Sequence, residues 1–270
     1  MDGKTYTPIN ENQSWACISA DDFVYIELIE NIVRAPGEVG IFLEHFHSES
    51  APGQWEFVLP PKVPVEAADT LLKARDTIRN IARAYKVHPT LYPRLSQEHA
   101  GTGSHVHISI NPKEHEESLN PEWFFAGVLN HIPPILAFTL PQDISYDRIQ
   151  AGLWSGGEYA CWGWENKEAA LRRIKDNYFE IKLMDEPLRG GDCSKSPTDM
   201  TPLEREALGV KVLLPKTLDE SLAALQSDEE IQNSTGKTLV SSYVAVKKTE
   251  MEHFRSIADE ERKLWQILRY

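Results

Sequence analysis

The chain has few cysteines, a deficit of positive charge and no long apolar run. Three cysteines in 270 residues, widely spaced at Cys17, Cys161 and Cys193, predict neither a disulfide framework nor a paired-cysteine metal site. Asp and Glu outnumber Lys and Arg by 41 to 28, with no basic block, which argues against binding to nucleic-acid phosphates. No apolar run approaches the roughly 18 residues of a membrane span, and no signal-peptide pattern opens the chain. We therefore expect a cytoplasmic protein without a membrane or nucleic-acid partner.

The apolar residues follow helical and strand periods in alternation. An apolar fraction of 41% with seven tryptophans indicates a folded core. Helices are predicted at residues 21–35, 65–87, 121–138, 199–209, 217–232 and 238–268, and strands at 39–46, 54–59, 90–93, 104–110 and 178–184. Pro36-Gly37 should end the first helix, and Pro133 with Pro134 should kink the third. A single α+β domain is the simplest interpretation.

A glycine loop leads into a strand with two histidines at residues 101–110. Alternate residues of a strand share one face, so His105, His107 and Ser109 should face outward together. Val106, Ile108 and Ile110 should fill the core on the other side. Two imidazoles behind a glycine loop favour a functional site. The alternative is a pair of strand histidines that hydrogen-bond to their neighbours.

Two glutamates, Glu49 and Glu56, lie seven positions apart across a Pro52-Gly53 turn. A hairpin that closes at this turn would bring both carboxylates to one site. Mg²⁺ and Mn²⁺ prefer several oxygen ligands, and Mn²⁺ also accepts an imidazole. The alternative is a solvated hairpin with two surface glutamates.

The strand predicted at 178–184 carries a third carboxylate. Alternation puts Glu180 and Lys182 on one face and Phe179, Ile181 and Leu183 on the other. Arg148 and Arg172 supply planar cations that suit a carboxylate or a phosphate. For each of these residues the alternative is an ordinary half-exposed or solvated side chain.

Taken in order, these segments resemble the catalytic domain of glutamine synthetase, in the FluG-like branch of the type I class. The family motif Gly-x-Gly-x-His-x-His-x-Ser is matched at residues 101–109, and the acidic hairpin is similar to residues 47–56. The motifs Asn-Ser-Tyr-x-Arg and Trp-Gly-x-x-Asn-Arg-x-Ala-x-Ile-Arg are similar to residues 144–148 and 162–172. The likeness runs from about residue 20 to the C-terminus. It implies an α+β fold of the glutamine synthetase/guanido kinase type, with a largely antiparallel curved sheet flanked by helices.

The resemblance also implies roles for individual residues. Metal ligands would be Glu49, Glu56, His105 and Glu180; ATP contacts would be Glu44, His107, Ser109 and Arg172; substrate contacts would be Gly101, Arg148, Lys167 and Lys182. Arg148 and Arg172 would be the catalytic cations. The implied reaction is an ATP-dependent ligation of glutamate with ammonia or an amine through γ-glutamyl phosphate, with Mg²⁺ or Mn²⁺. Two metals and several cations are what a phosphoryl transfer between anions needs.

The sequence departs from the family at several places. Lys167 and Lys182 stand where the family has arginines, and Trp154 stands where the ammonia-binding flap has a glutamate. The family also has an N-terminal β-grasp domain and a Glu-x-Glu metal strand before the matching region. We therefore expect residues 1–20 to be a remnant of the segment after that region and residues 21–270 to be the catalytic domain. Another copy in a homo-oligomer, or a partner chain, would then complete the site.

Two functions are compatible with these departures. The first is a glutamine-synthetase-type amide ligase, and the second is a non-catalytic relative with a regulatory or scaffolding role. The four predicted metal ligands favour the ligase. A cupin-type metal site is disfavoured, because cupins have three or four residues between the second histidine and the glutamate, and only Ser48 separates His47 from Glu49.

Overall fold

The computed structural model describes residues 7–10, 13–19, 23–111, 121–149, 157–175, 178–181 and 192–269. These form two compact units, Met1–Tyr92 with Leu264–Tyr270 and Pro93–Lys263. Helices accompany a two-stranded and a four-stranded sheet, so the α+β class is confirmed. Among the described helices, none has the length and apolar content needed to cross a bilayer.

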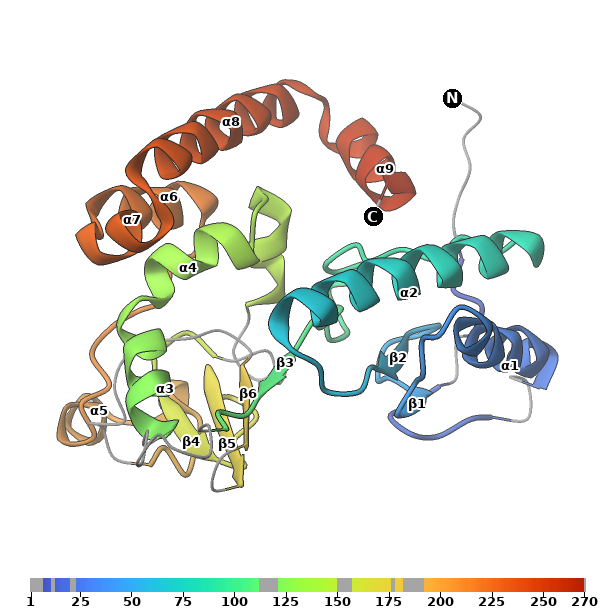
Figure 1. Cartoon of the computed structure of the whole chain (residues 1–270), viewed down its shortest axis with the longest axis horizontal. Coiled ribbons are helices and arrows are strands. Elements are labelled where there is room, and N and C mark those ends of the chain that lie inside the picture. Colours follow the sequence, from blue (N-terminus) through green and yellow to red (C-terminus); the bar gives the residue numbers. More distant parts are fainter. Residues whose placement is uncertain are drawn as a thin grey trace. The chain divides into compact units, whose positions relative to one another are not determined.

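The first unit is a β-hairpin packed on two helices (Figure 1). Its elements are α1 (Phe23–Glu38), β1 (His45–Ser48), β2 (Trp55–Val58) and α2 (Pro64–Ala84). Leu28, Ile29 and Ile32 of α1 form a buried cluster with Ala82 of α2. Trp55 and Phe57 of β2 pack against this cluster, so one face of the hairpin is fixed to the helices.

In this part of the chain the strand predicted at 39–46 begins later than expected, the strand predicted at 90–93 does not form, and the first helix ends later than expected. α1 continues through Pro36 to Glu38, because a proline in the last turn removes few helical hydrogen bonds. The Pro36 carbonyl then accepts hydrogen bonds from the Val39 and Ile41 amides at 3.1 and 2.8 Å, and Gly40 has a φ of 77°. These hydrogen bonds engage the Val39 and Ile41 amides, which a strand at 39–46 would need for pairing, so β1 begins only at His45. No strand forms at 90–93, where the Tyr92 amide donates instead to the Thr90 hydroxyl at 3.1 Å.

The second unit packs helices on a four-stranded sheet. Its strands are β3 (Val106–Ile108), β4 (Trp162–Trp164), β5 (Leu171–Lys175) and β6 (Tyr178–Ile181). Their order is β3-β6-β5-β4, with β6 antiparallel to both neighbours and β4 parallel to β5. The helices are α3 (Pro121–Asn130), α4 (Ile132–Thr139), α5 (Pro202–Ala207), α6 (Leu218–Ser227), α7 (Glu229–Thr235) and α8 (Lys237–Ser256), with 3-10 turns at Asp143–Arg148 and Pro197–Asp199. The largely antiparallel sheet agrees with the expectation.

Three predicted helices are each divided into two elements. The helix predicted at 121–138 breaks at His131 into α3 and α4, as the two prolines require. The helix predicted at 217–232 breaks at Asp228, whose carboxylate accepts a hydrogen bond from the Ile231 amide at 2.8 Å and so begins α7. The helix predicted at 238–268 breaks at Ile257 into α8 and α9 (Asp259–Arg269), whose last residues belong to the first unit.

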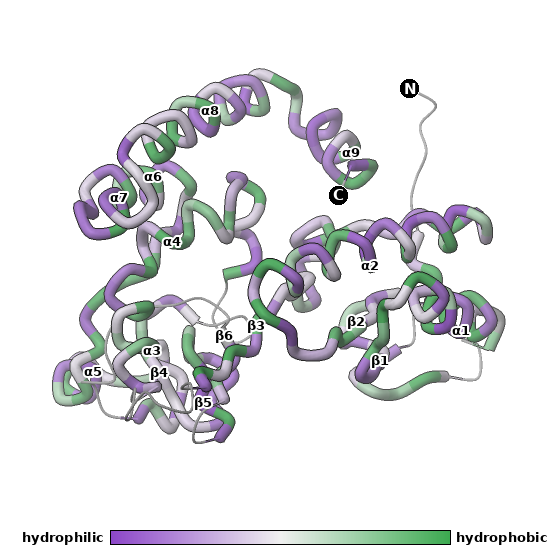
Figure 2. Tube along the Cα trace, in the orientation of Figure 1, coloured by the Kyte–Doolittle hydropathy of each residue, from purple (hydrophilic) through white to green (hydrophobic). Residues whose placement is uncertain are grey.

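The main core lies between α3, α4, α6, α8 and the sheet. Its fully buried residues include Phe125, Leu129, Ile132, Leu136, Leu171, Phe179, Leu218, Leu222 and Leu225. Figure 2 shows apolar and polar residues alternating around α8, whose Val240, Val244 and Met251 reach this core. A helical period of apolar residues on one face accounts for this packing.

Phe179 and Glu180 confirm the predicted alternation along β6. Phe179 is fully buried and stacks on Phe125 with ring centroids 3.9 Å apart, while Glu180 lies on the other face. The same prediction is only partly right for β3. Ile108 and Ile110 pack against the core, but Val106 is 54% exposed. Val106 is the first residue of the short strand β3, which lies at the edge of the sheet within the part of the chain that the structure describes.

Candidate functional site

The hairpin of the first unit places His47 opposite Glu56. The two residues are cross-strand partners in the β1–β2 register, as are Phe46 and Phe57 on the opposite face. The Glu49 amide closes the connection by donating to the Gln54 carbonyl at 2.9 Å, and Gly53 adopts a φ of 69° in the turn. The predicted hairpin is therefore confirmed, and it carries its polar side chains on the face away from α1 and α2.

His47, Glu49 and Glu56 form a group of three metal-type ligands. One nitrogen or oxygen atom of each lies within 4.8 Å of the others. His47 Nε2 is 4.0 Å from Glu49 Oε1, and His47 Nδ1 is buried without a hydrogen-bond partner among the described residues. Burial raises the pKa of the Glu49 carboxyl; the Ser50 amide opposes this rise, and the neighbouring Glu56 adds to it. Two carboxylates that repel one another, with an imidazole beside them, are the environment that a divalent cation would stabilise.

An N-terminal segment fixes the backbone of this hairpin. The Gln13 side-chain amide donates to the Glu49 and Ala51 carbonyls, each at 3.0 Å, and to the Gln54 carbonyl. The Ser48 hydroxyl donates to the Ser14 carbonyl at 3.0 Å. These hydrogen bonds fix the backbone of Glu49 at the start of the turn, and so they fix the point from which its side chain extends.

Glu180 is the centre of the polar face in the second unit. It is 5% exposed and lies on β6 between β3 and β5. Its Oε1 lies 2.9 Å from His105 Nδ1, and its Oε2 accepts a hydrogen bond from Arg172 Nη1 at 3.0 Å. Two adjacent ligands of an octahedral cation are about 3.0 Å apart, so the spacing of His105 and Glu180 also fits a shared cation.

Arg172 links this carboxylate to a second one. Its other terminal nitrogen donates to Glu165, which follows β4. Burial lowers the pKa of Arg172, but the hydrogen bonds that it donates to Glu165 and Glu180 outweigh this effect and raise its pKa overall. Arg172 is therefore a fixed cation whose guanidinium is held in place by two carboxylates.

Gly101 and Arg148 are also brought together. Arg148 Nε donates to the Thr102 carbonyl at 2.8 Å, and the Arg148 side chain lies 3.8 Å from the position of a Cβ on Gly101. The Thr102 amide donates to the Pro93 carbonyl at 2.8 Å, which holds the glycine loop in place. A Cβ on Gly101 would lie 2.5 Å from that same carbonyl oxygen, so only glycine fits here.

We expect Gly101→Ala to lower the free energy of unfolding by about 1–3 kcal/mol, because the loop must move away from the Pro93 carbonyl. Gly127→Ala is the matched control, since a Cβ on this α3 residue meets nothing within 4 Å and should be neutral or slightly stabilising. Urea unfolding of both variants measures the difference. Equal midpoints for the two variants would contradict the close contact at Gly101.

The remaining predicted site residues lie on β3, beside the strands, in a turn or outside the described residues. His107 pairs with Glu180 across the strands and its Nδ1 lies 2.7 Å from the Tyr178 hydroxyl. Glu44 and Ser109 are exposed near the strands β1 and β3. Lys167 is exposed in the turn between β4 and β5. Lys182 and Trp154 lie outside the described residues.

The sequence analysis considered His47 as a ligand only in the disfavoured cupin-type site, and it did not consider Glu165. His47 could have been found from the hairpin turn, since the register that pairs Glu49 with Gln54 also pairs His47 with Glu56. Glu165 gave no such signal. It reaches Arg172 because β4 and β5 are parallel neighbours. The backbone at Glu165, just after β4, adopts a left-handed conformation with a φ of 50°.

Comparisons with known proteins agree on one family. The glutamine synthetase catalytic domain matches residues 4–186 and 183–265. Protein fluG of Emericella nidulans is 40% identical over 288 residues, which cover 98% of this chain. Gamma-glutamylpolyamine synthetase GlnA3 of Streptomyces coelicolor is 27% identical over 85% of this chain. A solved GmaS/ADP complex superposes with a TM-score of 0.76 at 19% identity, covering 94% of this chain and 67% of that chain, which shows a shared fold.

The chain spans only part of the curated relatives. The match covers 33% of the fluG protein and 58% of GlnA3. What those longer proteins do as a whole therefore does not transfer directly to this chain.

Proposed function

The chain belongs to the glutamine synthetase catalytic-domain family, and from that premise we propose that it is an ATP-dependent ligase that joins glutamate to ammonia or an amine. Glutamate would first take the γ-phosphoryl group of ATP on its side-chain carboxylate. The amine would then attack the activated carbonyl carbon and release phosphate, which leaves an amide. This is the class of reaction that the family supports.

The observation that carries this proposal is the position of Glu180 between His105 and Arg172. A carboxylate that contacts both an imidazole and a guanidinium can hold a cation on one side and a phosphoryl-binding arginine on the other. The group of His47, Glu49 and Glu56 in the hairpin supports a second cation. Each group is proposed as a cation site within its own unit.

Each proposed residue has a task in this reaction. Divalent cations held by Glu49 with Glu56 and by His105 with Glu180 would neutralise the phosphate oxygens of ATP. Arg172 would stabilise charge on the transferred phosphoryl group, and Arg148 with the Gly101 backbone would orient the substrate glutamate. Further contacts are proposed for Glu44, His107 and Ser109 to the nucleotide and for Lys167 and Lys182 to substrate or phosphate.

The two lysines favour a second candidate function. A lysine presents a point charge where the family has a bidentate guanidinium, so transition-state stabilisation at Lys167 and Lys182 should be weaker. A chain that binds ATP and metal but turns over little would then serve a regulatory or scaffolding role. Binding and turnover must therefore be measured separately.

Metal binding tests the hairpin half of the proposal. We expect Mn²⁺ to bind the chain. The double variant Glu49→Gln with Glu56→Gln should lower the Mn²⁺ affinity of one site by at least about 10²-fold, because losing even a residue that only hydrogen-bonds to a metal ligand costs roughly 10–100-fold in affinity. Electron paramagnetic resonance of free Mn²⁺ measures the affinity. Glu30→Gln, which removes an exposed carboxylate of α1, is the control and should change nothing. Unchanged Mn²⁺ affinity in the double variant would refute the hairpin site.

Turnover separates the two candidate functions. ADP release is measured with ATP, Mg²⁺ or Mn²⁺ and glutamate, in the presence of ammonia, methylamine or a polyamine. Release that requires both glutamate and one amine supports the ligase and identifies the acceptor. Metal-dependent ATP binding without ADP release in any mixture supports the non-catalytic role instead.

A further inference from the structure

Two cysteines that the proposed reaction does not use lie together in the second unit. Cys161 directly precedes β4, and Cys193 comes 32 positions later in the chain, from 161 to 193. They share one buried cluster with Ala169, Met200 and Val210, in which Cys161 is 6% exposed and Cys193 is fully buried. Their side chains are hydrogen-bonded to one another. The fold therefore forms a pair of thiols that the spacing of the cysteines in the sequence does not reveal.

Backbone hydrogen bonds hold both cysteines beside β4. The Cys193 amide donates to the Trp162 carbonyl at 3.2 Å, and the Leu171 amide donates to the Cys161 carbonyl at 3.1 Å. The Asn166 side-chain amide also donates to the Cys193 carbonyl at 2.6 Å. Because the two thiols already contact one another on a fixed backbone, joining them requires a shift of the sulfur atoms and no rearrangement of the strands.

The contact makes the two thiols chemically unequal. The hydrogen bond with Cys161 lowers the pKa of the Cys193 thiol overall, although burial and the neighbouring Asp192 oppose this effect. The same hydrogen bond raises the pKa of the Cys161 thiol, and burial adds to the rise. Since the thiolate is the nucleophile in cysteine oxidation, Cys193 is the sulfur suited to react first and Cys161 is suited to resolve the product.

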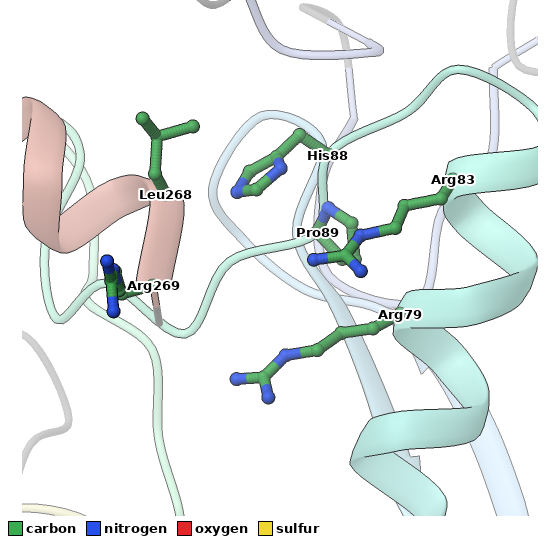
Figure 3. Close-up of a pocket in the computed structure, with 6 residues that line it drawn as sticks. All are labelled: Arg79, Arg83, His88, Pro89, Leu268 and Arg269. Carbon is green, nitrogen blue, oxygen red and sulfur yellow. The ribbon is translucent and has the colours of Figure 1, made fainter.

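A surface hollow of about 380 Å³ brings solvent to the edge of this cluster. Its lining includes Val210, which belongs to the cluster, and Tyr159, which packs against it. The cavity in Figure 3 differs, because its described lining comes from α2, the segment after α2 and the end of α9, and none of these lining residues belongs to the cluster. A small oxidant can therefore approach the cysteines from the hollow, whereas the burial of both side chains disfavours a bulky one.

We propose that Cys161 and Cys193 form an intramolecular disulfide when the chain reacts with hydrogen peroxide. The Cys193 thiolate attacks one peroxide oxygen and the O–O bond breaks, which leaves a sulfenic acid on Cys193 and releases the other oxygen as water. The Cys161 sulfur then attacks the Cys193 sulfur, the S–O bond breaks, and the departing hydroxyl takes the Cys161 proton and leaves as a second water. Two thiols and one hydrogen peroxide thus give one disulfide and two waters.

The disulfide would close a loop that carries most of the second sheet. The chain between the two cysteines contains β4, β5 and β6. A cross-link of this kind restricts the unfolded chain more than the folded one, so it stabilises the folded state. We expect oxidation to raise the melting temperature by at least about 5 °C. No step uses ATP, a metal or glutamate, so this inference stands independently of the proposed ligase reaction.

The test uses the full chain with the substitution Cys17→Ser, which removes the exposed cysteine of the first unit and its side reactions. The reduced, folded protein is treated with hydrogen peroxide and then digested without a reducing agent. We expect peptide mass spectrometry to find the Cys161–Cys193 cross-link, and thiol titration in denaturant to find that both thiols are lost. Dithiothreitol should restore both thiols and reverse the rise in melting temperature.

Cys161→Ala and Cys193→Ala, each in the Cys17→Ser background, are the matched variants. Neither should form the cross-link or gain stability from peroxide, and Cys161→Ala should accumulate a sulfenic acid that dimedone traps, because its resolving thiol is missing. Should either variant fail to fold, the peptide map of the Cys17→Ser chain still decides the question. Retention of both thiols in peroxide, or their oxidation to sulfinic acid without a cross-link, would overturn the proposal. A cross-link that forms only after unfolding in urea would overturn it as well.

Discussion

Replacing Glu180 with glutamine is expected to abolish metal-dependent ATP binding and to lower any ADP formation by about 10²–10³-fold. Glutamine has the size of glutamate but no negative charge, so it is a poor ligand for a divalent cation. It also removes the ion pair at 3.0 Å that helps to hold Arg172, and the contact at 2.9 Å with His105. Three roles of one side chain are lost together, so we expect this to be the largest functional effect of a single substitution.

Glu122→Gln is the matched control for this variant. Glu122 pairs with Arg173, the residue next to Arg172 on β5, at 2.6 Å, but it is far more exposed than Glu180. Both variants therefore remove one carboxylate from one arginine of the same strand. ATP binding is measured by calorimetry with and without Mn²⁺, after circular dichroism has shown that each variant is folded. If the two variants bound ATP equally well in Mn²⁺, Glu180 would not be a metal ligand.

Phe179→Ala is expected to lower the free energy of unfolding by about 3–5 kcal/mol. Phe179 is fully buried, and its ring stacks on Phe125 with centroids 3.9 Å apart. The Arg173 guanidinium lies 5.4 Å from the same ring, so the cavity left by the substitution would also loosen β5. Because Phe179 precedes Glu180 on β6, we expect the substitution also to displace Glu180 from its contacts with His105 and Arg172.

Trp123→Ala on α3 serves as the control for this loss. Trp123 is also a large aromatic residue, but it is 74% exposed, so its removal should change stability by no more than about 0.5 kcal/mol. Chemical denaturation with two spectroscopic probes gives both values. Similar losses in the two variants would show that Phe179 does not anchor the sheet.

Local patterns were sufficient wherever one segment decides the outcome. The Pro52-Gly53 turn predicted the hairpin that brings Glu49 and Glu56 together, because turn geometry fixes the register of adjacent strands. Alternation predicted that Phe179 is buried and that Glu180 lies on the other face. Two prolines predicted a kink in the region where the chain divides into α3 and α4. The motif order likewise predicted the family, which the comparisons confirmed.

Local patterns failed where a neighbouring segment competes for the same backbone or covers the same face. The first residues of the strand predicted at 39–46 form the cap that ends α1, so the strand begins later. Val106 has the alternation of a core residue, but β3 is an edge strand and leaves it exposed. Neither competition is visible in the hydrophobic pattern of the segment itself.

The sequence by itself determined the family, the α+β class and which side chains share a strand face, since each follows from short-range periodicity and motif order. Only the tertiary structure decided which of those faces meet. Glu180 contacts both His105 and Arg172 because β6 lies between β3 and β5, and Glu165 reaches Arg172 because β4 runs parallel to β5. The strand order brings together residues as far apart in sequence as His105 and Glu180, which are 75 positions apart. That order is set by the free energy of packing the whole sheet, which no single segment determines.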